Sequence, residues 1–486
     1  MLRLNHYLDS FGFMVLFLAG LTILYLLAYL GHPVLPGNDP SAPIGWWGWW
    51  DQGQYLKCTA ALSQGQLTPD TYWYPLGYPL IGALFYHWAP QHAFLIPNLA
   101  FVLGSTFLFY KISRRLVSPL EAILLILTFI GSYLGLLQMT LVEPWNTTPT
   151  LFLAYLIIFL VGFRQPSARR LLAAFVCVGL IFVCRPGDAF CMAAVPAIAI
   201  LGVPRWRTRM FVGLAGIGIV GAFVLIILYV NHAVFGTWRT PYDRIHEEMG
   251  VGSYSVPSKA FGLLIDGDTI FREPQAALVR HFPWAVLVVP GAVYLLLRYK
   301  AQALGILLSV LATYGLYFLY NDFWPSTVYR YHGIHYLLWT IPFMVLATYF
   351  SVKEAWKHKL GRWSYLSVPL LLFPVFFVYL RERTIGSLPN TLPVVIHSET
   401  TAEPVDWIFC EGAYACPDLV AEGRRLIRKG DFEDSLRPDG TIILLSTKLR
   451  YSPIQVDPGA LSGLRQIKYG NLHWTVRWKR PKESTN

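Results

Sequence analysis

The carboxylate with the clearest chemical setting is Asp51, which directly follows a tryptophan-rich stretch over residues 45–50. Tryptophan prefers the interface between membrane and water, so we expect Asp51 near the depth of a lipid headgroup. A carboxylate there could take the proton of an acceptor hydroxyl that attacks a lipid-borne partner. A solvated loop residue or a helix N-cap would explain the same aspartate without any chemistry.

A second acid, Glu143, stands before Pro144 where an apolar run is expected to leave the membrane. An acidic group near the apolar zone is costly unless it is paired or used. Pairing with a nearby base is the structural explanation. The short loop around Glu143 contains no lysine or arginine, which favours a functional role.

Two arginines have the chemistry of phosphate ligands, because a planar guanidinium matches phosphate oxygens. Arg185 precedes a Pro-Gly pair that breaks a helix at the end of an apolar run, and Arg330 directly precedes another run. A local ion pair with Asp188 is the alternative for Arg185. For Arg330 the alternative is a side chain that reaches lipid headgroups.

A metal site has little support in the sequence. Asp243, His246, Glu247 and Glu248 could form a cluster, but adjacent helical residues point in different directions, and a solvated loop face is the simpler explanation. We therefore predict that no cofactor is required and that a divalent metal is at most an accessory. The chain also contains no Walker loop and no dinucleotide fingerprint, so a nucleotide-sugar donor is unsupported.

The composition of the whole chain places these groups in a membrane protein. Of 486 residues, 55% are hydrophobic and only 14% are charged, whereas soluble proteins carry about a quarter charged residues. Apolar runs near the ~20 residues that cross a bilayer recur along the chain. We predict about eleven transmembrane helices, near residues 11–31, 94–110, 120–137, 147–163, 171–184, 189–203, 210–230, 283–297, 302–320, 333–350 and 364–380. The short fifth and sixth runs could instead form a re-entrant pair.

The charges between these runs predict the orientation. Alternate loops are rich in lysine and arginine, which the positive-inside rule assigns to the cytoplasm. The net charge of +11 is spread over these short loops, so it indicates membrane orientation and not nucleic-acid binding. The opposite side then receives Asp51, Glu143, Arg185 and Arg330. It also receives the external loops 32–93 and 231–282.

The last part of the chain, residues 381–486, is more polar than residues 1–380 and has a different pattern. Strand-like runs at 394–397, 407–410, 441–446 and 473–478 surround a helix-like stretch over 417–429. We predict an all-α polytopic membrane domain over 1–380, followed by a small extracytoplasmic α/β domain over 381–486.

Over residues 1–350 the motifs resemble the GT-C superfamily of membrane glycosyltransferases. This superfamily includes protein O-mannosyltransferases, aminoarabinose transferases of lipid A and PIG-V-like mannosyltransferases. The order and common sidedness of several motifs carry the resemblance: Asp51 followed by Tyr55, Tyr74-Pro75-Leu76-Gly77-Tyr78-Pro79, Glu143-Pro144, Arg185-Pro186-Gly187, Asn231 with Phe235-Gly236, and Arg330-Tyr331.

The resemblance implies an enzyme that moves a sugar from a polyprenyl-phosphate donor to a glycan, lipid or protein acceptor. Asp51 and Glu143 would be its catalytic acids, and Arg185 and Arg330 would bind the donor phosphate. The residues expected to contact substrate are Tyr55, Tyr74, Tyr78 and His332. A bacterial inner membrane, with the site on the periplasmic face, fits the compact loops.

A transporter or flippase of a lipid-linked saccharide is the competing class of protein. Transporters place polar residues in the middle of interrupted helices that are arranged as repeats. Here the apolar runs are nearly free of charge, no internal repeat is visible, and the polar residues gather on one face. This distribution favours chemistry at a membrane surface over translocation.

Overall fold

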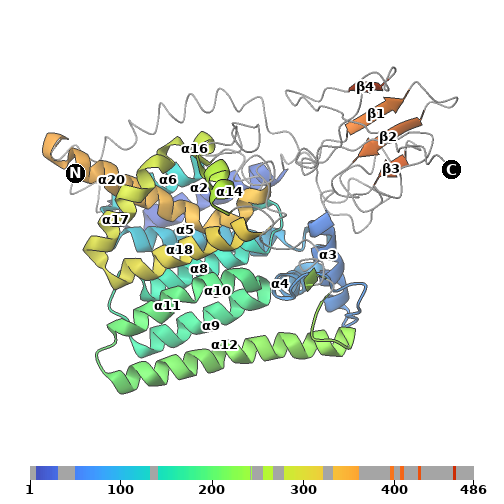
Figure 1. The fold of residues 1–486 in the computed structure, drawn as a ribbon, viewed down its shortest axis with the longest axis horizontal. Coiled ribbons are helices and arrows are strands. Elements are labelled where there is room, and N and C mark those ends of the chain that lie inside the picture. Colours follow the sequence, from blue (N-terminus) through green and yellow to red (C-terminus); the bar gives the residue numbers. More distant parts are fainter. Residues whose placement is uncertain are drawn as a thin grey trace, which may run out of the picture. The chain divides into compact units, whose positions relative to one another are not determined.

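The structure is a computed structural model, and its helices and strands divide into two compact units (Figure 1). The first unit comprises residues 1–33 and 54–381, and the second comprises residues 34–53 and 382–486. Within these, the structure describes residues 7–30, 50–131, 141–240, 242–243, 256–265, 278–320, 332–360, 394–398, 405–409, 425–427 and 464–466.

The described helices account for most of the first unit. They are α2 (Phe11–Leu30), α3 (Trp50–Ser63), α4 (Gly77–Tyr86), η1 (Pro90–His92), α5 (Leu95–Ser113), α6 (Pro119–Gly131), α8 (Thr147–Val161), α9 (Ala168–Cys184), α10 (Pro186–Met192), α11 (Ala194–Ala199), η3 (Ile200–Gly202), α12 (Trp206–Phe235), α14 (Val256–Leu264), α16 (Leu278–His281), η5 (Pro283–Leu287), α17 (Val288–Tyr299), α18 (Ala301–Leu319), η6 (His332–Thr340) and α20 (Ile341–Leu360).

Five helical segments of the described chain are long and apolar enough to cross a membrane: Phe11–Leu30, Pro90–Ser113, Trp206–Phe235, Ala301–Leu319 and His335–Ala355. Shorter apolar helices lie between them. The multi-pass membrane character predicted from the sequence is therefore supported. The count of eleven spans remains a prediction, and its last run, 364–380, lies outside the described residues.

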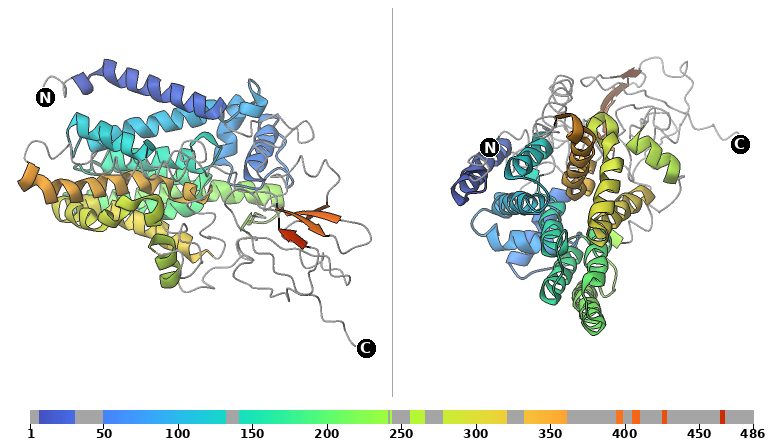
Figure 2. Two further views of the ribbon diagram at one scale, coloured as in Figure 1. Left: turned by 90° about the horizontal axis from the view of Figure 1, so that it is seen from above. Right: turned by 90° about the vertical axis from the view of Figure 1, so that its left-hand side faces the viewer.

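The packing of these helices separates lipid-facing from central positions. In α12 only 11% of the apolar window is buried, whereas 89% is buried in the window His335–Ala355 that contains most of α20. Viewed nearly end-on, α2 and α12 lie at edges of the bundle (Figure 2). Apolar helices that leave most of their side chains uncovered are consistent with helices that face lipid, as expected for α2 and α12 in a multi-pass membrane protein.

A chain of neighbours connects these edges. α2 packs on α5, α5 on α8, α8 on α9, and α9 on α12, which lies along the lower border of the helices in Figure 1. On the other side, α11 packs on α18, and α17 packs on both α18 and α20. α8 and α9 thereby lie between other helices, and α8 buries three threonines, Thr147, Thr148 and Thr150, at its N-terminal end.

At the ends of α6 and α20 a buried carboxylate joins two helices. Glu121 accepts hydrogen bonds from the Ser118 backbone N–H (2.7 Å), the Lys353 Nζ (2.9 Å) and the Tyr349 hydroxyl. Ser118 and Glu121 form the capping box of α6, in which the N3 acid satisfies an orphan N–H. The partners of Glu121 on α20 explain how an acid is tolerated in this apolar helix.

The second unit contains a four-stranded sheet in the order β3-β2-β1-β4. Strands β1 (Val394–Ser398) and β2 (Val405–Phe409) are antiparallel, with Val394 opposite Phe409. β4 (Leu464–Gln466) pairs antiparallel with β1, and β3 (Arg425–Ile427) pairs parallel with β2.

The predicted strand at 394–397 corresponds to β1, and that at 407–410 overlaps β2. The helix predicted over 417–429 is wrong at residues 425–427, which form β3, and its other residues lie outside the described ones. The parallel pairing of β3 with β2 supplies hydrogen bonds that a local pattern cannot reveal. The runs at 441–446 and 473–478 also lie outside the described residues.

Candidate functional site

Arg185 lies at the break between α9 and α10, inside the helical unit. Pro186 occupies the first position of α10, and Arg185 has φ −160° and ψ 87°, which is not helical. A proline disfavours the helical region for the residue before it, so Arg-Pro-Gly ends α9 as the sequence predicts. The Arg185 side chain is only 11% exposed, although it leaves from the very end of an apolar helix.

Three side chains from different elements hold the Arg185 guanidinium. Its Nε donates to the Tyr317 hydroxyl oxygen (2.8 Å) and lies 3.0 Å from the Asp188 Oδ2. Its Nη1 donates to the Asn146 Oδ1 at 3.0 Å. The Tyr317 hydroxyl in turn donates to the Asp188 Oδ1 at 2.6 Å. The ion pair proposed as the structural explanation for Arg185 is therefore present.

The second terminal nitrogen of Arg185, Nη2, has no hydrogen-bond partner among the residues that the structure describes. A guanidinium has five N–H donors in a fixed plane, and the three neighbours use only Nε and Nη1. The pair with Asp188 therefore fixes the guanidinium and leaves the N–H groups of Nη2 for an external acceptor. An ion pair and a phosphate ligand are compatible roles for this arginine.

Aromatic rings cover the faces of this guanidinium. The Arg185 Cζ lies 4.5 Å from the ring centroid of Tyr336 and 5.3 Å from that of Tyr317. Rings at this distance attract a cation and shield it from water. Tyr336 also lies 4.2 Å from the ring of His335, which stacks on Trp145 at 3.9 Å.

Glu143 belongs to the same region of the chain and is 1% exposed. Its Oε2 accepts a hydrogen bond from the Trp145 Nε1 at 3.2 Å, and Trp145 carries the stack with His335. One short segment, residues 143–146, thus contributes Glu143 at one end and the Arg185 ligand Asn146 at the other. Glu143 therefore lies three residues before the Asn146 that binds Arg185.

The N-terminus of α8 adds further donors beside Asn146. Asn146 does not cap the helix, because its side chain binds Arg185 and donates to the Cys184 carbonyl at 3.1 Å. The hydroxyls of Thr147 and Thr148 are buried and have no hydrogen-bond partner within the described part of the chain. Buried hydroxyls without partners are costly, and a helix N-terminus attracts anions. These threonines therefore add anion-binding capacity beside Arg185.

The predicted substrate tyrosines form one cluster. Tyr55 lies 4.9 Å from Tyr74 and 5.2 Å from Tyr78, and Tyr74 lies 4.9 Å from Tyr242, all between ring centroids. The Tyr78 hydroxyl donates to the Asn98 Oδ1 at 2.9 Å. The aromatic stretch over 74–79 and the start of the long loop after α12 are therefore neighbours, as their common sidedness requires.

Asn231 ties the same loops to the end of α12. Its Oδ1 accepts a hydrogen bond from the Tyr72 hydroxyl at 2.6 Å, and its Nδ2 donates to the Trp238 carbonyl at 3.2 Å. Gly236, at φ 67°, then ends α12 in the left-handed conformation that glycine adopts without strain. The Asn231 and Phe235-Gly236 motif therefore positions loops and does not itself supply reactive groups.

Gly77, in the aromatic stretch over 74–79, lies close to Cys184, the residue before Arg185. A Cβ at position 77 would lie 2.6 Å from the Cys184 Sγ and 2.9 Å from the Val183 carbonyl carbon. We expect Gly77→Ala to push α4 away from the end of α9, to destabilise the protein by about 1–3 kcal/mol, and to displace Arg185. Thermal unfolding of the purified variant, compared with Gly12→Ala on the uncrowded face of α2, measures this effect. Equal stability of the two variants would contradict this close approach.

The other predicted residues are less well placed. Asp51 lies in the first turn of α3, a position where a carboxylate also favours the helix dipole. Arg330 lies outside the described residues, and His332 begins η6. Asp243 accepts hydrogen bonds from the backbone N–H and the hydroxyl of Thr240, both at 2.8 Å. His246, Glu247 and Glu248 lie outside the described residues.

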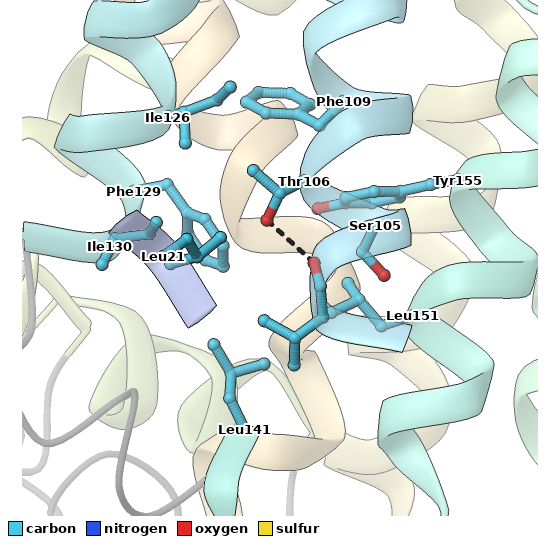
Figure 3. Close-up of a pocket in the computed structure, with 11 residues that line it drawn as sticks. Leu21, Ser105, Thr106, Phe109, Ile126, Phe129, Ile130, Leu141, Leu151 and Tyr155 are labelled. Carbon is cyan, nitrogen blue, oxygen red and sulfur yellow. Dashed lines mark hydrogen bonds between the residues drawn. The ribbon is translucent and has the colours of Figure 1, made fainter. Parts of the chain in front are cut away.

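A small cavity lies elsewhere in the bundle, between α2, α5, α6 and α8 (Figure 3). Its lining is almost wholly apolar, and Thr106 turns its hydroxyl onto the Val102 carbonyl at 2.9 Å. The cavity volume is about 10 Å³, which is room for a single water-sized sphere. It is a packing gap behind α2, and no reactive group points into it (Figure 3).

The sequence did not single out Tyr317, Tyr336, His335 or Trp145. Each is an aromatic residue in or beside an apolar run, where interfacial anchoring is the ordinary explanation. Only their positions in the sequence could have pointed to them, because all lie at ends of apolar runs assigned to the same side as Arg185 and Glu143.

Comparison with known proteins adds no assignment. No protein-family model matches the chain, and no curated protein matches it significantly.

Proposed function

We propose that the chain is an integral membrane glycosyltransferase that takes a sugar from a polyprenyl-phosphate donor. One observation carries this proposal. Arg185 is fixed by Asp188, Tyr317 and Asn146, while its Nη2 and the buried hydroxyls of Thr147 and Thr148, which follow Asn146 in the chain, have no hydrogen-bond partner among the described residues. A preorganised set of donors of this kind suits a phosphate on which negative charge develops.

In the proposed reaction Asp51 accepts the proton of the acceptor hydroxyl while its oxygen attacks the anomeric carbon of the donor sugar. The bond from that carbon to the phosphate oxygen breaks, the configuration inverts, and the polyprenyl phosphate leaves with the electron pair. Phosphate is already a stable anion, so the reaction needs no general acid. Arg185 and Arg330 stabilise the charge that grows on the leaving phosphate.

The remaining groups of the proposed site bind and orient the substrates. Glu143 positions the acceptor or a donor hydroxyl, since its carboxylate is held by Trp145 beside the Arg185 ligand Asn146. Tyr55, Tyr74 and Tyr78, with His332, offer aromatic and polar contacts to a sugar. No metal or cofactor is required in this scheme.

The proposal includes a place for the reaction. Several long apolar helices are consistent with a multi-pass membrane protein. We assign the site to the extracytoplasmic face of a bacterial inner membrane, in a bundle of about eleven spans. The acceptor is a glycan, lipid or protein, and the domain at 381–486, proposed to be α/β, contributes to its recognition. The protein would not bind nucleic acid.

A transfer assay tests the proposal. Purified wild type and Asp51→Asn receive a panel of radiolabelled polyprenyl-phosphate sugars with membrane-extract acceptors. We expect product from the wild type and a loss of about a hundredfold or more in Asp51→Asn, since a hundredfold is the lower end of the range for a general base. Equal activity would remove Asp51 from the mechanism and direct attention to Glu143.

The same preparations distinguish an enzyme from a transporter or flippase. In proteoliposomes a flippase moves the lipid-linked saccharide across the bilayer without forming a covalent product. Translocation without product would therefore reject the transferase. A product formed only from diphosphate-linked donors would identify a glycan ligase or polymerase instead.

A further inference from the structure

Three arginines gather at the C-terminal end of α8, away from the site at its N-terminus. Arg115 donates to the carbonyl oxygens of Phe159 (2.6 Å) and Gly162 (2.7 Å), which a helix leaves without partners at this end. The Phe159 ring centroid lies 4.6 Å from the Arg115 Cζ and 6.0 Å from the Arg164 Cζ. One aromatic ring thus lies near two guanidinium groups.

The third member, Arg170, lies in the first turn of α9. Its backbone N–H is capped by the Ser167 hydroxyl, but no acid is present in this turn. Two arginines, Arg169 and Arg170, stand there instead, although a helix N-terminus disfavours positive charge. The sequence of α9 is therefore unfavourable at this end unless an anion is supplied from outside.

The charges of the three arginines repel one another. Burial, together with the positive charges of Arg164 and Arg170, lowers the pKa of Arg115 to about 10. Burial and the charge of Arg170 also lower the pKa of Arg164. The lowered pKa values of Arg115 and Arg164 mean that the folded protein disfavours their charged forms, and a nearby anion would offset this cost.

No carboxylate of the described chain forms an ion pair with Arg115, Arg164 or Arg170. Two other partly buried bases do have such partners: Arg114 pairs with Asp9 at 3.2 Å and Lys353 with Glu121 at 2.9 Å. In the cluster of Arg115, Arg164 and Arg170, three bases lie close together and none of them has a carboxylate partner within the described chain.

The backbone beside the cluster is strained. Phe163 has φ 49°, an unfavourable conformation for a bulky residue, and its ring packs against Tyr299 with centroids 5.3 Å apart. That packing fixes the turn after α8 and with it the position of Arg164. The turn at Phe163 is thus held at an energetic cost, and it places the positive charge of Arg164 near those of Arg115 and Arg170.

The location indicates what the anion is. α8 has 15 residues and is therefore about 22 Å long, and its apolar side chains end at the arginines. The end of a membrane helix lies at the depth of the lipid headgroups, whose anionic members attract basic clusters between helices. We propose that Arg115, Arg164 and Arg170 bind the phosphate of an anionic phospholipid headgroup at this end of α8.

Lipid titration of the detergent-purified full chain tests the proposal. Phosphatidylglycerol is added in mixed micelles, and the thermal unfolding midpoint and the apparent Kd are measured, with phosphatidylcholine and inorganic phosphate as parallel arms. We expect phosphatidylglycerol alone to raise the midpoint. An equal response to phosphatidylcholine or to inorganic phosphate would overturn the lipid assignment.

The test variant is Arg164→Gln with Arg170→Gln, because Arg115 also caps α8 and its removal would confuse the result. Each arginine near an anionic surface contributes about a factor of five, so binding should weaken about twenty-five-fold. In phosphatidylcholine the variant should be at least as stable as the wild type, since repulsion is relieved. Lower stability there would assign the arginines a structural role and overturn the proposal.

Arg205→Gln with Arg207→Gln is the matched control, because both are exposed bases at the start of α12. The loops 162–167 and 202–205 adjoin, since a Cβ on Gly202 would lie 3.2 Å from Pro166. The control therefore removes two charges, as the test variant does, from the same end of the bundle. An equal loss of phosphatidylglycerol binding in this control would show diffuse attraction and would overturn a defined site.

Discussion

Asp188→Ala is expected to destabilise the protein by about 3–5 kcal/mol and to abolish sugar transfer, because it leaves the Arg185 cation buried without its counter-charge. Asp188 is 1% exposed, and both of its oxygens are used, one by Arg185 and one by Tyr317. Unfolding of the purified variant in denaturing detergent measures the loss. The matched control is Asp9→Ala, whose carboxylate is 42% exposed and pairs with Arg114. It should cost about 1 kcal/mol or less.

Arg185→Lys separates structure from chemistry at the same position. Lysine keeps the charge near Asp188 but lacks the planar fork that reaches Tyr317, Asn146 and a further acceptor together. We expect this variant to fold with a smaller loss of stability than Asp188→Ala, while kcat for transfer falls about 10²–10³-fold. Wild-type transfer in Arg185→Lys would confine Arg185 to a structural ion pair and remove the central support for the proposed function.

The sequence identified Arg185 and Glu143 because each violates the composition around it. A charged residue at the end of an apolar run is conspicuous, and the Pro-Gly pair after Arg185 marks a helix break that the structure confirms. The short runs before and after this break form α9 and the segment α10, α11 and η3. Patterns over neighbouring residues were sufficient for these elements.

The partners of Arg185 could not be predicted in the same way. Tyr317 lies 132 residues beyond Arg185 in the chain, in a run of α18 where tyrosine looks like an ordinary membrane aromatic. Its role arises only because α10 and α11 pack on α18 and bring its hydroxyl to Asp188 and Arg185. Hydrophobic periodicity gives the faces of helices but not which two faces meet.

The strands of the second unit show both what a local sequence pattern predicts and what it misses. β1 and the overlapping β2 follow alternating or β-branched residues and were expected at 394–397 and 407–410. The three residues of β3, Arg-Leu-Ile, carry no alternation and follow a stretch with helical composition. Their parallel pairing with β2 decides their conformation, and pairing of this kind is invisible in a local window.

Close packing of α17 on α20 leads to the other large effect, at Gly291. A Cβ at this position would lie 1.8 Å from the Ala347 carbonyl oxygen and 2.4 Å from its carbon, and neither is a movable side-chain end. Small residues allow membrane helices to approach closely, and any larger residue here must separate two backbones. We therefore expect Gly291→Ala to cost about 3 kcal/mol or more, the upper part of the range for overpacking.

The control for Gly291→Ala is Gly218→Ala in α12, where a Cβ would meet nothing within 4 Å. Alanine is the better helix former, so this control should be neutral or slightly stabilising, by up to about 1 kcal/mol. Unfolding of both variants in denaturing detergent gives the comparison. Separation of the helices should also disturb α20, whose Thr348 hydroxyl donates to the Trp284 carbonyl and whose Lys353 binds Glu121. If Gly291→Ala were as stable as Gly218→Ala, α17 and α20 could not be in direct backbone contact.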